Sequence, residues 1–112
     1  MTIDIESILK DILAQSETLA AQMLKDFSNQ GLNDVKQFLV DSKDDLARWG
    51  GELAQGQITK EEFEDLVQGQ VDVALLHGLK ETGLGEIELD KFKNGVIDIV
   101  TKVVMNAAGK II

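Results

Sequence analysis

The chain has 112 residues, of which 44% are apolar and 28% charged, which is the balance of a single soluble globular domain rather than of a disordered chain. Its net charge of −9 argues against a nucleic-acid backbone as partner, because such binding needs clustered Lys and Arg, and it disfavours anionic membrane surfaces too. The absence of cysteine excludes disulfides, thiol catalysis and zinc–thiolate sites.

Two further features of the composition bear on class and location. The chain contains no proline and is rich in Leu, Ala, Glu, Gln and Lys, which favours long helices. The first residues, MTIDIESILKDIL, are acidic and lack the pattern of a signal peptide, and no stretch approaches the ~18 uncharged apolar residues of a membrane span. We therefore expect a cytoplasmic protein of a bacterium or phage with no membrane association.

The first predicted helix spans residues 3–28. Gly31, in the following SNQGLND, is suited to end it in a left-handed conformation, and Asn33 is suited to cap the next helix. Its core-facing stripe follows steps of four and three: Ile5, Leu9, Ile12, Ser16, Leu19 and Met23.

The second predicted helix, residues 33–54, has the most regular apolar seam in the chain. Gly50 and Gly51 weaken its end, at roughly 1 kcal/mol for each glycine relative to alanine. The seam alternates steps of four and three, as in a helical bundle: Val35, Leu39, Ser42, Leu46, Trp49 and Leu53.

The third and fourth predicted helices cover residues 59–80 and 88–108. Gly69 and Gly78 interrupt the third helix and would allow another helix to approach closely. The Val and Ile content of the fourth leaves a strand there as an alternative. The core candidates of the third are Phe63, Leu66, Val67, Val71, Ala74 and Leu75. Those of the fourth are Leu89, Phe92, Val96, Ile97, Ile99, Val100, Val103, Val104 and Ala107.

Two helix starts resemble each other, since GQITKEEF and GEIELDKF both read G-x-I-x-x-x-x-F. In each, the Ile and the later Phe are placed to pack together as a hydrophobic staple. Four helices of similar length with short glycine connectors predict an all-α fold, a four-helix up-and-down bundle in one domain over residues 1–112. The alternative is a pair of helical hairpins whose cores are completed by homodimerisation.

The stretch GQITKEEFEDL also has the spacing of the end of a calcium-binding EF-hand loop, with Glu62 as the last ligand. The first ligand positions would then be Gly51, Leu53 and Gln55, which lack the carboxylates that calcium requires. Thr59-x-x-Glu62 is instead a capping box for the third helix. We therefore expect no calcium site here.

The segment LAQGQITKEEFEDL resembles the second half of the short helical-hairpin domains of the SHOCT family. That resemblance implies a helical hairpin with a role in oligomerisation. In this chain the segment is internal and continues into two further predicted helices, which departs from the family. The matching residues are Leu53, Gly56, Ile58, Thr59, Glu61, Glu62, Phe63 and Leu66.

Candidate catalytic groups are few. His77 is the only histidine, and with no Glu-x-x-His or C-x-x-C-H motif beside it we interpret it as a structural residue. The acidic clusters DSKDD and EEFED are typical of solvated helix faces, and the Gly83–Gly85 connector matches no phosphate-binding motif. An enzyme that uses His77 and a nearby carboxylate is therefore an alternative without a nominated site, and no cofactor is expected.

The C-terminal segment is unusually apolar, with eleven apolar residues among the seventeen from 96 to 112. Its face exceeds what one side of a small bundle needs, so either this helix is central or another chain covers it. Trp49 is interpreted first as core and then as an interface anchor. The candidate interface residues are Trp49, Val96, Val100, Val103, Val104, Ala107 and Ile111.

These observations favour a small acidic helical protein that acts as an interaction or oligomerisation module without catalytic activity. Its partner would be a second copy of itself or an apolar helix of another protein. The alternative is a carrier of a small apolar ligand in the bundle interior, between the helix that bears Gly69 and Gly78 and the fourth helix.

Overall fold

The computed structural model of the chain describes residues 4–74 and 77–109, with the side chains of 73, 74 and 77 excluded. Its elements are α1 (Ile5–Met23), the short 3-10 helix η1 (Lys25–Phe27), α2 (Ser28–Ala54), α3 (Lys60–Ala74), α4 (His77–Glu81) and α5 (Glu86–Ala107). The described chain is helical, without strands, which confirms the all-α prediction and settles the fourth segment as a helix.

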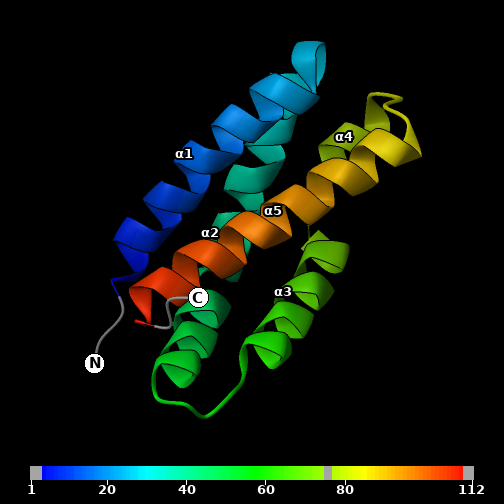
Figure 1. Ribbon diagram of the computed structural model, residues 1–112. Coiled ribbons are helices and arrows are strands. Elements are labelled where there is room, and N and C mark those ends of the chain that lie inside the picture. The colour runs from blue at the N-terminus through cyan, green and yellow to red at the C-terminus, as the bar shows by residue number, and fades with distance from the viewer. Residues whose placement is uncertain (1–3, 75–76, 110–112) are drawn as a thin grey trace.

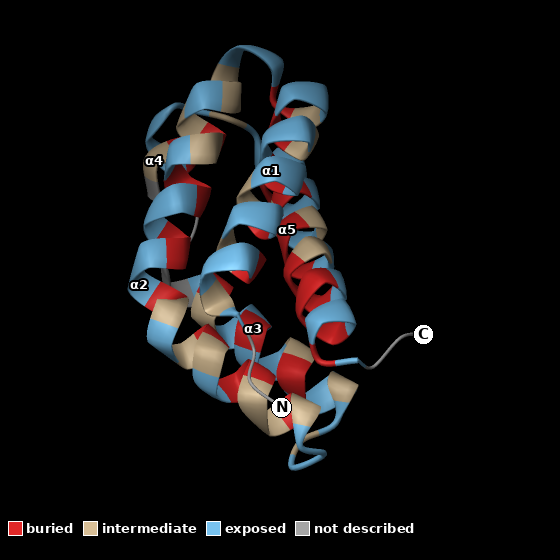
Figure 2. Cartoon of the chain, turned by 90° about the vertical axis from the view of Figure 1, so that its left-hand side faces the viewer, coloured by how far each residue is buried: buried red, intermediate tan, exposed pale blue. Residues whose placement is uncertain are grey.

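The four long helices form a bundle about 42 Å long, in which consecutive helices run in opposite directions (Figure 1). α1 packs against α2 and α5, and α3 packs against the same two helices from the other side. Figure 2 shows that buried residues lie on the inward sides of the helices and exposed residues on the outer sides. The arrangement agrees with the predicted up-and-down topology of four main helices, with α4 as a short addition.

The turn between the first two helices lies earlier than the sequence analysis placed it. α1 ends at Met23, and the chain reverses through Leu24 and η1, where Lys25 has a φ of 49°. Gly31 does not end a helix but lies inside α2, buried against Leu24 and Phe92. The turn comes early because Leu24 is itself needed in the core, with 3% of its surface exposed.

The predicted seam of α2 is confirmed in full, because all six of its residues are buried, Ser42 included. Residue Leu66 of α3 is an exception among the core candidates, with 37% of its surface exposed. The side chain of Ala74 and the whole of Leu75 lie outside the described part of the structure.

The two similar helix starts behave differently. Phe63 and Phe92 are both fully buried, and Ile58 is partly buried against the core. Ile87 is 68% exposed, so the second staple does not form. Gly56 has a φ of 76° at the turn after α2, a conformation that glycine adopts without steric cost.

Candidate functional site

A groove runs along the outside of the bundle between α1 and α2, with a volume of about 530 Å³. Leucines from both helices form its floor, and charged side chains from both helices stand along its edges. It covers about two turns of each helix, residues 6–13 and 36–43. Its lining residues are Glu6, Leu9, Lys10, Leu13, Lys36, Leu39, Val40 and Lys43.

The apolar part of this α1–α2 groove is accessible to another molecule. Leu9 and Leu13 are only half-buried, although both pack against the core. Val40 is 72% exposed, more than either of the other large exposed apolar side chains among the described residues. Accessible apolar side chains edged by charged residues make this groove a candidate docking surface.

The charged edge of the groove is positive. Glu6 and Lys43 form an ion pair across the groove. The hydrogen bond from Lys43 to Glu6 and the negative charge of Glu6 both raise the pKa of the Lys43 ammonium. Lys10 and Lys36 are exposed and form no ion pair with any described residue. Three lysines against one glutamate make the groove a basic region of a chain whose net charge is −9.

The sequence contains a signal for this groove that the periodicity analysis passed over. Val40 lies one position beyond the core seam of α2, and Lys36 and Lys43 stand four residues before it and three after it. These spacings put all three on one helix face. An apolar side chain between two lysines is readable in the sequence, but only the packing of α1 beside it creates a groove.

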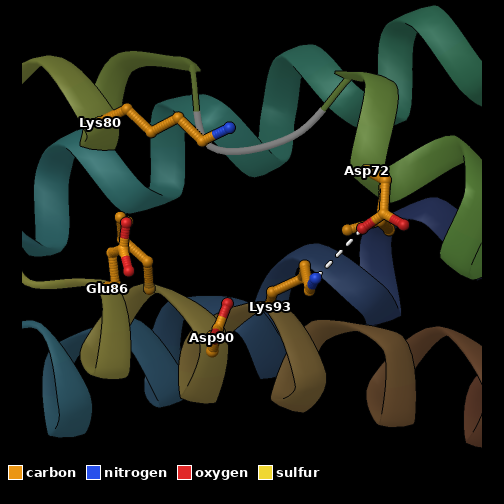
Figure 3. A pocket seen from close by; sticks show the side chains of 7 residues that line it. Asp72, Lys80, Glu86, Asp90 and Lys93 are labelled. Atoms are coloured by element: carbon orange, nitrogen blue, oxygen red, sulfur yellow. Dashed lines mark hydrogen bonds and ion pairs between the residues drawn. The ribbon is translucent and has the colours of Figure 1, made fainter.

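A second, smaller pocket of about 200 Å³ lies between α3, α4 and α5. Figure 3 shows that charged side chains from these helices surround it, and that Lys93 pairs with Asp72 at 3.1 Å. Its lining residues are Val71, Asp72, Lys80, Glu86, Leu89, Asp90 and Lys93. Two ammonium groups and three carboxylates make it a mixed-charge pocket with one more negative group than positive.

This pocket lies between the helices named for the apolar ligand site, but at the surface of the bundle rather than in its interior. The side chains there are mainly charged, which does not suit an apolar ligand. Gly69 is exposed, with no atom near the position of a Cβ, so it brings no helix close. Gly78 does allow a close approach, because a Cβ there would meet Gln30 and Asp34 of α2.

Asp34 is the best-connected buried carboxylate among the described residues. It is 8% exposed and accepts hydrogen bonds from the backbone amides of Gly78, at 3.2 Å, and Leu79, at 2.8 Å. Gln30 donates a third hydrogen bond, at 3.1 Å. Asp34 therefore caps the N-terminus of α4 from another helix, which explains a polar residue in the interior without a functional role.

The candidate interface on the fourth helix is mostly interior. Val96, Val100, Val103 and Val104 have at most 5% of their surfaces exposed, covered by the chain's own helices. In a single chain this face therefore corresponds to the central-helix alternative.

Trp49 is also buried, with the Arg48 guanidinium 5.9 Å from its ring centroid. Ala107 is exposed, and Ile111 lies outside the described residues.

The remaining candidates carry little chemistry. His77 is the first residue of α4, and its side chain lies outside the described set. The capping box is confirmed, since the Thr59 amide donates to Glu62 at 2.9 Å and the Glu62 amide donates to Thr59 at 3.1 Å. Among the side chains that the structure describes, no three acidic groups gather where they could hold a metal ion.

Comparison with known protein families, characterised proteins and solved structures finds no match for this chain. The SHOCT-like residues 53–66 form the end of α2, the turn after it and the capped start of α3. No helix in the described part of the chain has the length and apolar character needed to cross a membrane.

Proposed function

We propose that this protein is an interaction or oligomerisation module that receives an apolar helix of another chain in the α1–α2 groove. The main support for the proposal is the exposure of Val40, whose surface is 72% accessible in the groove that Leu9, Leu13 and Leu39 also line. A groove between two antiparallel helices can bind the apolar face of an amphipathic helix. The proposal assigns the protein no catalytic step.

The groove replaces the fourth helix as the favoured docking surface. Most of the described apolar face of α5 is already buried, so using it would require the bundle to open. The groove requires no such opening, because Val40 is exposed and Leu9 and Leu13 are only half-buried in the folded chain. Partners bound to a preformed surface lose less free energy to rearrangement than partners that must first open a fold.

The test compares Val40→Asp with Ile87→Asp in native mass spectrometry over a concentration series. Both residues are exposed apolar side chains, at 72% and 68%, but Ile87 lies outside the groove. Untagged protein isolated from the cells that produce it should carry a partner or form a multiple of the 12.3 kDa chain. Val40→Asp should abolish that complex, whereas Ile87→Asp should retain it.

Circular dichroism of both variants establishes that the fold is intact, since neither substitution places a carboxylate in the core. A wild-type protein that is a bare monomer at every concentration would contradict the proposal. Equal loss of the complex in both variants would also contradict it, because the groove would then have no special part in binding.

A further inference from the structure

If the groove binds a helix, as the proposed function holds, we infer that this partner helix is acidic. It is an amphipathic helix whose apolar stripe is flanked by Asp or Glu. The groove supplies two kinds of contact in a fixed arrangement. Leucine side chains line the floor, and three lysines stand at the edges, from both helices. A partner that fills the floor necessarily brings its flanking residues next to these ammonium groups.

The spacing along α2 suits a helix. Lys36, Val40 and Lys43 lie on one face, and the groove extends over about two turns, roughly 10 Å. A helix laid in it would present apolar residues at positions i, i+3 or i+4, and i+7. The residues beside that stripe would then face Lys36 on one edge and Lys10 on the other.

The charge of the groove selects an acidic partner. Lys10 and Lys36 are exposed and unpaired among the described residues, so they can form ion pairs with a partner without breaking existing ones. The chain as a whole carries −9, so its other surfaces repel an acidic segment and leave the groove as the favoured place for contact. Such complementarity chiefly determines specificity and the rate of association.

The same charges disfavour a second copy of this chain. A two-fold symmetric contact places each patch against itself, so the lysines of one groove would face those of the other. Two chains of −9 would also repel each other at long range. The groove therefore fits an acidic segment of a different protein better than it fits its own copy.

The experiment uses two synthetic amphipathic helices of about 18 residues, long enough to hold helical structure. Both have the same leucine stripe, and one is flanked by Glu and the other by Lys. Binding to the full-length chain is measured by fluorescence anisotropy at about 0.05 M and about 0.5 M salt. We expect the Glu-flanked peptide to bind at least about tenfold more tightly at low salt, and this preference to shrink at high salt.

Matched double variants test the lysines. Lys10→Gln with Lys36→Gln should weaken binding of the Glu-flanked peptide by about tenfold. Lys91→Gln with Lys102→Gln changes the net charge equally at exposed positions of α5 outside the groove, and should weaken it little. Val40→Asp should abolish binding of both peptides.

The outcomes separate the two claims. If both peptides bind equally and Val40→Asp abolishes both, the groove is a docking site but its partner is not selected by acidity, which overturns this inference alone. If neither peptide binds, or if Val40→Asp has no effect, the proposed function fails with it. Tight binding of laurate that displaces the Glu-flanked peptide would assign the groove to a lipid anion and overturn the inference.

Discussion

Asp34 links segments that lie far apart in the sequence. Its carboxylate accepts from two amides that follow it by 44 and 45 residues, and no other described side chain bonds to them. In a continuous helix these amides would bond to carbonyls four residues earlier. Asp34 therefore caps a separate helix, α4. The unbroken helix over residues 59–80 that periodicity predicts is not what the chain forms.

Replacing Asp34 with alanine should lower the free energy of unfolding by about 1–2 kcal/mol, because the buried Leu79 amide and the part-buried Gly78 amide lose their acceptor. Asp34→Asn should cost less, since the amide oxygen retains one acceptor group. Asp44→Ala, an exposed acid on the same helix, is the control and should change stability little. Urea denaturation measures all three, and equal effects for Asp34→Ala and Asp44→Ala would refute the capping role.

Asp4 caps α1 and gives the fold a pH dependence. Its carboxylate accepts from the Ser7 hydroxyl at 2.9 Å and the Ser7 amide at 3.3 Å, and these bonds hold its pKa below the ordinary value of 3.8. Because the folded-state pKa is the lower one, the stabilisation is complete above 3.8 and is lost as pH falls through the folded-state pKa.

The melting temperature of Asp4→Ala should therefore lie below that of the wild type at neutral pH, and the difference should shrink as the pH falls below 3.8. Thermal melts monitored by circular dichroism at several pH values provide the measurement. A difference that persists unchanged into acid would show that the cap does not act through its charge.

At the scale of the element, α2 shows how packing decides where a helix begins. The sequence has a strong helix stop in Gly31 and a good cap in Asn33, and the chain uses neither. The absence of a side chain at Gly31 instead allows Leu24 of the preceding turn and Phe92 of α5 to pack against the α2 backbone. Burying these two side chains outweighs the helix propensity that the glycine forgoes.

Two glycines of α2 should consequently respond in opposite ways to alanine. Gly31→Ala should lower the free energy of unfolding by about 1–2 kcal/mol, because the added methyl group collides with the buried Leu24 side chain. Gly51→Ala should raise it by about 0.5–1 kcal/mol, since a Cβ there meets no atom within 4 Å. Chemical denaturation measures the free energy of unfolding of both variants. A stabilising Gly31→Ala would contradict the close packing of Leu24 against the α2 backbone.

At the scale of the whole molecule, the surplus apolar face of α5 is explained by its position. α5 lies between α1 and α3 and also contacts α2 (Figure 1). Gly95 brings it close to α1, since a Cβ there would meet Leu19. A helix that is covered on two sides needs a wider apolar face than a helix packed on one side.

Val104→Asp should therefore unfold the protein rather than dissociate an assembly. Val104 is fully buried, so the substitution would place an unpaired carboxylate in the core at a cost above about 4 kcal/mol. Ala107→Asp, one turn later and exposed, should cost less than about 1 kcal/mol. Circular dichroism with analytical ultracentrifugation distinguishes the results, and a folded Val104→Asp monomer would restore the interface interpretation.

Local periodicity and capping chemistry were enough to predict much of the molecule. Three features depend on residues within a few positions of one another: the all-α class, the α2 seam with its buried Ser42, and the capping box of Thr59 and Glu62. Such signals are readable from sequence because helical geometry converts fixed spacings into shared faces.

Only the tertiary structure decided the features that join distant segments. The Asp34 cap, the early turn before Gly31 and the covering of α5 all depend on which helices become neighbours. The α1–α2 groove is of the same kind, since only the packing of α1 against α2 brings Leu9 and Leu13 beside Val40. Packing decides whether an apolar side chain is buried or accessible, because burial depends on what covers a residue rather than on its place in a periodic pattern.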